Sequence, residues 1–318
     1  MEAKRFFQLA RAGTKTLKVF FGPFVRYAFL GQVKPVLAGY KITHRCNLTC
    51  AHCPYWGRSG TELDFQGVLE TLHCLRAWGI RILILEGGEP LLWRDPDHTI
   101  KDVILAARQL FPVVCVTTNG TVPWGHLPLD RVWVSLDGPP DVHDTIRGKG
   151  VFAIALRRVK EEGKGNTFIN TTVTCVNLKT IPDLIKMLHG IVAGITIQFY
   201  YPYHGLPDPL FVPHESRLPL LAELIRLKQE GYPIANSVGS LNELKREHWS
   251  CEDQLLANAE PDGSMFHGCY LKNRASARCS YCGFAAHNEM TLAFQGRVES
   301  IITGIRTFFL GNQEKALP

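Results

Sequence analysis

Apolar runs of strand length recur along the first two thirds of the chain, and most of them end in a polar or glycine-rich cluster. This pattern predicts strands over residues 36–44, 81–86, 112–118, 131–136, 167–175 and 194–201. Apolar residues at helical spacing between these runs predict helices over residues 64–78, 97–110, 150–163 and 178–189. Alternating strands and helices are typical of parallel βαβ units, so the sequence predicts an α/β fold built as a partial (β/α)6 barrel.

Three cysteines directly after the first predicted strand give the most specific chemical signal. Cys46, Cys50 and Cys53 have the spacing C-x3-C-x2-C on one loop. Closed structural zinc sites and ordinary iron–sulfur clusters use four thiolates. Three thiolates can hold a [4Fe–4S] cluster by three irons and leave the fourth iron open to a substrate or cofactor. The alternative is a zinc loop whose fourth ligand is distant in sequence.

The second predicted strand ends in Gly87, Gly88, Glu89 and Pro90. Glycines let a backbone approach a ligand closely, and a carboxylate accepts charge-assisted hydrogen bonds from an ammonium group. A Gly-Gly-Glu-Pro turn without a binding role is the alternative. Further polar residues follow the later strands, so their side chains are expected at the same edge of the sheet.

These motifs together resemble the radical SAM superfamily over most of the chain. The resemblance rests on the cysteine spacing, the Gly-Gly-Glu-Pro sequence, and Ser135-Leu-Asp-Gly followed by His143-Asp-x-x-Arg-Gly. It implies a TIM-like (β/α)6 core over residues 36–235. It also implies that the three cysteines hold a [4Fe–4S] cluster whose open iron binds S-adenosylmethionine (SAM). The resemblance further implies that a partner such as ferredoxin or flavodoxin reduces the cluster. One electron from the cluster then cleaves SAM to a 5′-deoxyadenosyl radical, which removes hydrogen from an unactivated carbon.

The resemblance also implies which residues contact SAM or the substrate. The candidates are Gly87, Gly88, Glu89, Pro90, Asn119, Ser135, Asp137, Arg147 and Gln198. Glu89 and the glycine backbone are expected to receive the methionyl amine, and Arg147 to pair with the SAM carboxylate. A solvated loop arginine is the alternative for Arg147. Tyr200 and Tyr201 are candidates for the adenine or substrate pocket, with a place in the core as the alternative.

A second group of four cysteines lies in the last quarter of the chain: Cys251, Cys269, Cys279 and Cys282. Asp262-Gly263 between the first two predicts a hairpin turn. The group resembles the twitch domain, a shortened SPASM domain, and implies a C-terminal region over residues 236–318 with a second, auxiliary [4Fe–4S] cluster that transfers electrons. Five residues, rather than the usual four, separate Gly263 from Cys269. A zinc ribbon is the alternative, since spacing does not distinguish iron from zinc.

The composition of the 318-residue chain, with 46% apolar and 20% charged residues, is that of a globular protein. Seven of the ten cysteines fall in the two ligand-like groups. We predict that the other three, Cys74, Cys115 and Cys175, are buried core thiols. Cysteine used in this way favours a reducing, cytoplasmic location over a disulfide-bonded secreted protein.

The N-terminal segment, residues 1–35, is basic and rich in phenylalanine. Residues 1–45 contain nine Lys or Arg and one acid, a net charge of +8 against +6 for the whole chain. Phenylalanines on one helical face and basic residues such as Lys4, Arg11 and Lys15 on the other predict a helix lying on a membrane surface. Packing on the open edge of the barrel is the alternative. Nucleic-acid binding is not expected, because no recognition motif follows.

The substrate class is open on the sequence alone. The basic amphipathic opening is similar in character to that of radical SAM proteins that modify membrane lipids, which favours a lipid or isoprenoid. A peptide is the first competing class, although no leader-peptide-binding domain is seen ahead of the barrel. A small alcohol or sugar, oxidised with help from the auxiliary cluster, is the second. The non-enzymatic alternative is a metal-stabilised scaffold or an electron carrier.

Overall fold

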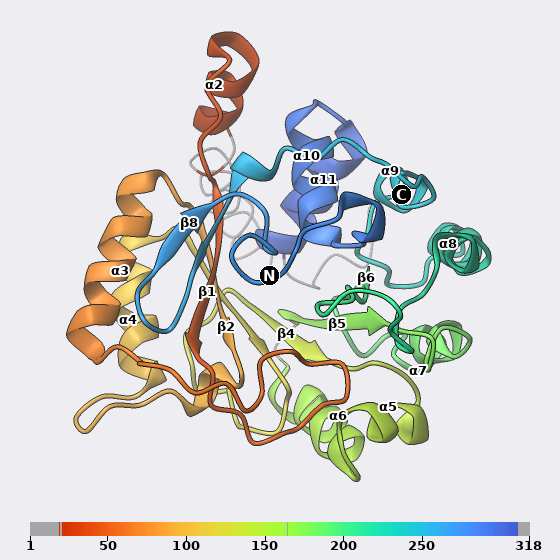
Figure 1. The fold of residues 1–318 in the computed structure, drawn as a ribbon, viewed down its shortest axis with the longest axis horizontal. Coiled ribbons are helices and arrows are strands. Elements are labelled where there is room, and N and C mark those ends of the chain that lie inside the picture. Colours follow the sequence, from red (N-terminus) through yellow and green to blue (C-terminus); the bar gives the residue numbers. More distant parts are fainter. Residues whose placement is uncertain (1–18, 20, 164, 311–318) are drawn as a thin grey trace, which may run out of the picture.

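A single mixed sheet organises the computed structural model, which describes residues 19, 21–163 and 165–310. Its strand order is β6-β5-β4-β3-β2-β1-β7-β8. Each of the strands β1 to β6 pairs in parallel with the next one in the chain. They are β1 (Leu37–Thr43), β2 (Ile82–Gly87), β3 (Val113–Thr118), β4 (Arg131–Ser135), β5 (Thr167–Val173) and β6 (Gly194–Phe199). The six predicted strands are therefore confirmed, and the sequential parallel order is that of an open barrel (Figure 1).

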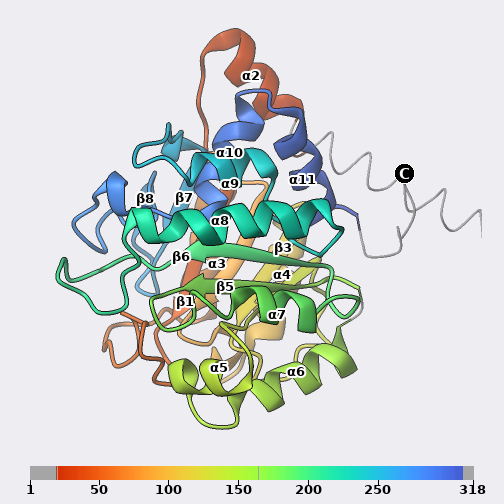
Figure 2. The same ribbon diagram turned by 90° about the vertical axis from the view of Figure 1, so that its right-hand side faces the viewer.

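Helices cover the outer face of the sheet (Figures 1 and 2). They are α3 (Phe65–Trp78), α4 (Ile100–Leu110), α5 (Pro140–Arg147), α6 (Val151–Glu162), α7 (Ile181–Met187) and α8 (His214–Gln229). Asp64 caps α3, because its carboxylate accepts a hydrogen bond from the Gly67 amide at 2.9 Å. Short 3-10 turns occupy η2 (Pro90–Leu92), η3 (Asp253–Leu255) and η4 (Cys279–Tyr281).

The C-terminal region continues the same sheet. Strand β7 (Leu256–Ala259) pairs in parallel with β1, and β8 (Met265–His267) pairs antiparallel with β7. The predicted hairpin turn is confirmed, and Gly263 in it has a positive φ of 82°. The C-terminal region also contains three helices that pack against one another: α9 (Val238–Glu243), α10 (Ala285–Phe294) and α11 (Val298–Phe308).

Alternation along β1 separates two apolar cores. Ala38, Tyr40 and Ile42 point to the large core shared with the outer helices. Leu37, at the amino end of the same strand, belongs to a smaller core that includes Met290 and Phe294 of α10. Helices α10 and α11 therefore close the interior of the half-barrel near the amino ends of the strands.

Helix α2 (Gly22–Leu30) projects from the body of the molecule (Figure 1). Its inner side touches α10, where Tyr27 meets Phe294 edge-on with ring centroids 5.7 Å apart. Its other side exposes Phe29 and Leu30 to 78% and 62% of their surface. Most of the predicted amphipathic face, including Phe6, Phe7 and Leu17, lies outside the described residues, whereas the Phe24 ring of that face lies 6.4 Å from the Phe294 ring of α10. Among the residues described, no helix has the length and apolar character needed to cross a bilayer.

The prediction of three buried core thiols is correct for one cysteine and wrong for two. Cys115 on β3 is buried, whereas Cys74 and Cys175 are exposed. Cys74 lies on the solvent side of α3, next to the buried Leu75. Cys175 follows the end of β5, and its thiol donates to the Phe211 carbonyl at 2.9 Å.

Candidate active site

The first cysteine group lies where β1 ends. Cys50 is buried, and Cys46 and Cys53 are half-buried. Burial, followed by the neighbouring Cys53 and Cys46, raises the pKa of the Cys50 thiol to about 11, while Arg147 opposes this effect. The three thiols therefore lie close enough to repel one another when ionised. A cationic or metal centre between them relieves that repulsion, so the donor set fits an iron–sulfur cluster.

Backbone and side-chain N–H groups already point at these sulfurs. The Leu48 amide lies 3.4 Å from Cys46 Sγ, and the Tyr55 amide lies 3.4 Å from Cys53 Sγ. Asn119 Nδ2 lies 3.8 Å from Cys46 Sγ. Donors of this kind favour ionised thiolates and tune the potential of a cluster bound to them. Within the described part of the chain, no three His, Cys, Asp or Glu side chains converge on the position of a single metal ion.

The two glycines after β2 allow this strand to lie against the base of the cysteine loop. The Gly88 amide donates to the Thr43 carbonyl at 2.7 Å, and the Glu89 amide donates to the Arg45 carbonyl at 2.8 Å. A Cβ atom on Gly87 would lie 2.2 Å from the Thr43 carbonyl oxygen, and one on Gly88 would lie 2.4 Å from that of Arg45. The close approach that requires glycine here is therefore to the protein's own backbone.

The geometry gives Glu89 a different task from the one expected. Its side chain is fully buried. Its carboxylate accepts hydrogen bonds from Thr118 Oγ1 at 2.9 Å, from the Asn119 amide at 2.7 Å and from the Leu91 amide at 3.1 Å. Burial raises the pKa of Glu89 to about 7, although these donors oppose the rise. With these donors in place, Glu89 connects the loop after β3 to the loop after β2, and Pro90 is likewise buried at the start of η2.

Arg147 and Asp137 form a buried ion pair beside the cysteine loop. Arg147 Nε lies 2.5 Å from Asp137 Oδ2, and its Nη1 lies 3.9 Å from Cys50 Sγ. The other Asp137 oxygen accepts the Thr172 amide at 2.9 Å. Burial acts against both charges, yet the pairing holds the pKa of Asp137 below and that of Arg147 above its ordinary value. Asp137 therefore orients Arg147 and does not itself reach a ligand hydroxyl.

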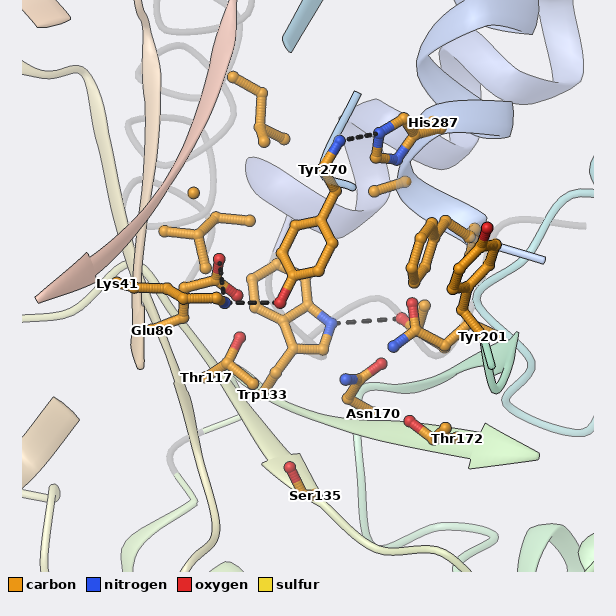
Figure 3. Close-up of a pocket in the computed structure, with 18 of the residues that line it drawn as sticks. Lys41, Glu86, Thr117, Trp133, Ser135, Asn170, Thr172, Tyr201, Tyr270 and His287 are labelled. Carbon is orange, nitrogen blue, oxygen red and sulfur yellow. Dashed lines mark hydrogen bonds and ion pairs between the residues drawn. The ribbon is translucent and has the colours of Figure 1, made fainter. Parts of the chain in front are cut away.

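A cavity of about 370 Å³ opens beneath the cysteine loop (Figure 3). The structure brings most of the predicted site residues to its wall: Cys46, Cys50, Cys53, Gly87, Gly88, Asn119, Ser135, Arg147 and Gln198. Tyr200 and Tyr201 also line it. Glu89, Pro90 and Asp137 lie behind this wall and contribute through the residues that they hold.

A buried polar cluster on the cavity wall was missed in the sequence. Lys41 is 1% exposed, and its Nζ lies 3.1 Å from Glu86 Oε1 and 2.5 Å from the Tyr270 hydroxyl. Burial lowers the pKa of Lys41 to about 8, against the opposing effect of Glu86. The available signal was a lysine at an inward-facing position of an otherwise apolar strand.

The second cysteine group also gathers in space. Burial raises the pKa of Cys282 to about 12, and Cys269 and Cys279 add to the rise. Burial likewise raises the pKa of Cys251, followed by the effects of the other three thiols. The Leu271 amide lies 3.4 Å from Cys269 Sγ. The four thiols influence one another electrostatically, but among the described residues no three of them converge on a single metal position.

Comparison with known proteins agrees with the site. Residues 40–188 match the family model described as the radical SAM superfamily. The chain is 34% identical over 173 residues to a pre-heme d1 synthase of Dinoroseobacter shibae, which covers 49% of this chain and 41% of the relative. It is 28% identical over 172 residues to the sporulation killing factor maturation protein SkfB of Bacillus subtilis, covering 49% and 40%. The chain thus spans less than half the length of these curated relatives.

Solved structures show the same fold at low sequence identity. The crystal structure of Streptococcus suis SuiB bound to S-adenosylmethionine aligns with a TM-score of 0.63 at 14% identity, covering 87% of this chain and 68% of that one. The structure of anSMEcpe with bound AdoMet and a peptide aligns with a TM-score of 0.56 at 16% identity, covering 89% and 92%.

Proposed function

The chain belongs to the radical SAM superfamily through residues 40–188, and from this premise we propose that it is a SAM-cleaving radical enzyme. The observation that carries the proposal is that Cys46, Cys50 and Cys53 on one loop line the same cavity. A [4Fe–4S] cluster held by these three cysteines would supply the electron that splits SAM, and the radical so formed would remove a hydrogen atom from an unactivated carbon of the substrate.

The chain's own residues prepare this site before any ligand binds. Asn119 and Arg147 place N–H donors beside Cys46 and Cys50. A positive guanidinium at that place also suits the SAM carboxylate. Ser135 and Gln198 face the same cavity and offer hydrogen bonds to the nucleoside part of SAM or to the substrate. Glu89 and Asp137 act as positioning residues, since each holds a neighbour that faces the cavity.

For the substrate we propose a lipid or isoprenoid. The inner end of the cavity is apolar, with Leu37, Ile84, Trp133, Met290 and Phe308 on its wall. Such a chamber favours the hydrocarbon part of a ligand, whose C–H bonds need radical chemistry. A peptide is the second candidate, because the similar SuiB structure was also solved with its precursor peptide SuiA.

We propose further that Cys251, Cys269, Cys279 and Cys282 hold an auxiliary [4Fe–4S] cluster that exchanges electrons with the reaction. A ferredoxin or flavodoxin would reduce the first cluster. The apolar surface of α2 and the basic residues that precede it favour contact with an anionic membrane surface, where a lipid substrate is found.

The test is anaerobic formation of 5′-deoxyadenosine from SAM with dithionite as reductant. We expect the reconstituted chain to form it and the Cys46→Ala, Cys50→Ala and Cys53→Ala variants to lose it entirely. Cys74→Ala removes an exposed thiol outside both groups and is the matched control, with unchanged formation expected. Cleavage retained by the three variants would contradict the proposal.

A further inference from the structure

The interior of the half-barrel changes character along each strand. On β1 the inward-facing positions run from Leu37 through Gly39 to Lys41. On β4, Trp133 is followed by Ser135. Apolar groups thus gather at the amino ends of the strands and polar groups at the carboxyl ends, below the cysteine loop. The cavity consequently has an apolar end and a polar end.

Helices α10 and α11 pack across the apolar end of the cavity but do not fill it with side chains. Small residues line the cavity from both helices: Ala285, Ala286, Ala293, Ser300 and Gly304. Arg131 at the start of β4 fixes α11 over this end, because its Nε and Nη2 donate to the carbonyls of Thr307 and Leu310 at 2.6 and 2.7 Å. The chamber therefore continues as far as a firmly held floor.

Lys41 places a positive charge at the polar end of the cavity, on the side formed by β1 (Figure 3). Its ammonium group lies between two aromatic faces, 4.4 Å from the centroid of Tyr55 and 4.5 Å from that of Tyr270. Among the described residues, one carboxylate lies within ion-pair distance of it, that of Glu86 at 3.1 Å. The described side chains accept two of its three N–H donors, Glu86 and the Tyr270 hydroxyl.

A second buried cation lies nearby. Arg274 stacks over the ring of Tyr270 at 4.2 Å from its centroid. Its counter-ion Glu260 is shared, since that carboxylate also lies 3.6 Å from His44 Nε2. Arg274 Nη2 is buried and finds no hydrogen-bond partner among the described residues. Of these two buried cations, Lys41 lines the cavity, and its unused donor favours a ligand that brings an acceptor oxygen and negative charge.

We propose that Lys41 anchors the anionic end of the substrate, so that the substrate is an amphiphile whose acidic group lies against Lys41 and whose hydrocarbon part extends toward α10 and α11. The inference rests on the proposed function for the identity of the cavity as a substrate site. Tyr55, which touches Lys41, follows Cys53 by two residues. An acidic group held here therefore keeps the adjoining carbons nearest to the cluster loop.

The test uses binding, so it stands apart from SAM cleavage. Dodecanoate and dodecyltrimethylammonium share one tail and differ in the charge of the head. We expect calorimetric titration of the anaerobically reconstituted protein to show dodecanoate binding at least tenfold more tightly than the cation. Lys41→Met should remove this preference.

Two further variants separate anchoring from a structural role. Glu86→Gln removes the carboxylate that competes for Lys41, so dodecanoate binding should tighten, whereas a purely structural ion pair predicts loss with either substitution. Ala293→Leu fills the apolar end and should weaken dodecanoate more than octanoate, while Ala153→Leu on the exposed face of α6 should change neither. Equal binding of anion and cation by the unaltered chain, or an unchanged preference in Lys41→Met, would overturn the proposal. Absent SAM cleavage with the preference intact would instead contradict the proposed function.

Discussion

At the scale of single residues, the wall of the cavity depends on side chains that lie behind it, because the carboxylates of Glu89 and Asp137 hold Asn119 and Arg147 in place. The cysteine spacing led directly to Cys46, Cys50 and Cys53, because ligand spacing within one loop survives folding unchanged. Glu89 and Asp137 were expected to contact ligands because they belong to the family motifs. In the structure their carboxylates also bind neighbouring protein groups. A sequence does not reveal which partner a carboxylate will find once other elements pack around it.

Lys41 shows the opposite case. The apolar run over residues 36–44 predicted β1 correctly, but the charge inside it received no role. Its inward direction follows from the alternation of the strand. Its partners Glu86 and Tyr270 come from β2 and from a loop 229 residues later in the chain. The contact between Lys41 and Tyr270 depends on the pairing of β7 with β1, and no sequence motif predicts that pairing.

The role of Glu89 as a brace predicts a measurable pH dependence of stability. The folded state raises the pKa of Glu89 from 4.5 to about 7. Between these values the folded chain binds more protons than the unfolded chain, so this group makes the free energy of unfolding fall as pH rises. Glu89→Gln should remove that slope. It should also cost about 1–3 kcal/mol at pH 7, because the NH2 group of the glutamine must face either the Asn119 or the Leu91 amide, each of which is itself a donor.

Urea unfolding under anaerobic conditions at several pH values between 4.5 and 8 measures both effects. Glu230→Gln, on the exposed end of α8, is the matched control and should leave the slope as it is. A Glu89→Gln variant with the same slope and stability as the unaltered chain would show that Glu89 does not brace the loop.

At the scale of elements, the apolar pattern predicted strands most reliably where both faces of the strand are buried. The six parallel strands were predicted to within two residues at each end, because central parallel strands are continuous apolar runs. Helix α5 was not predicted. Its sequence Pro140–Arg147 is polar, and its short turns were interpreted as a ligand-binding motif. Helix α10 also lacked a clear signal, since it is buried on most of its surface and has weak amphipathic character.

Helix α2 offers a prediction about the membrane. Phe29 and Leu30 are among the most exposed apolar residues described, and the helix contains Arg26 but no acid. If this surface meets lipid, Phe29→Ser with Leu30→Ser should lower sedimentation with phosphatidylglycerol vesicles by roughly tenfold, because each side chain loses about 1.5–3 kcal/mol of apolar burial at most. Leu206→Ser, 47% exposed on the loop after β6, is the control and should change little. Equal sedimentation of all three proteins would remove α2 from any membrane contact.

At the scale of the whole molecule, one sheet connects the two cysteine groups. The predicted C-terminal region begins outside the barrel pattern, yet β7 lies directly beside β1, and Tyr270 from this region lines the cavity. The cavity therefore has the first cysteine group at its mouth, the polar cluster of Lys41 on its wall and an apolar end under α10 and α11. This arrangement follows from strand order, which single-sequence patterns do not encode beyond neighbouring βαβ units.

The central claim is that Cys46, Cys50 and Cys53 hold a cluster with an iron open to SAM. Electron paramagnetic resonance of the dithionite-reduced, anaerobically reconstituted chain, recorded with and without SAM and alongside iron analysis, tests it most directly. We expect about eight irons per chain, about four in the Cys279→Ala and Cys282→Ala double variant, and one cluster signal that changes when SAM is added in both proteins. A reduced spectrum that SAM leaves unchanged, or iron content unaffected by replacing Cys46, Cys50 and Cys53, would contradict the account.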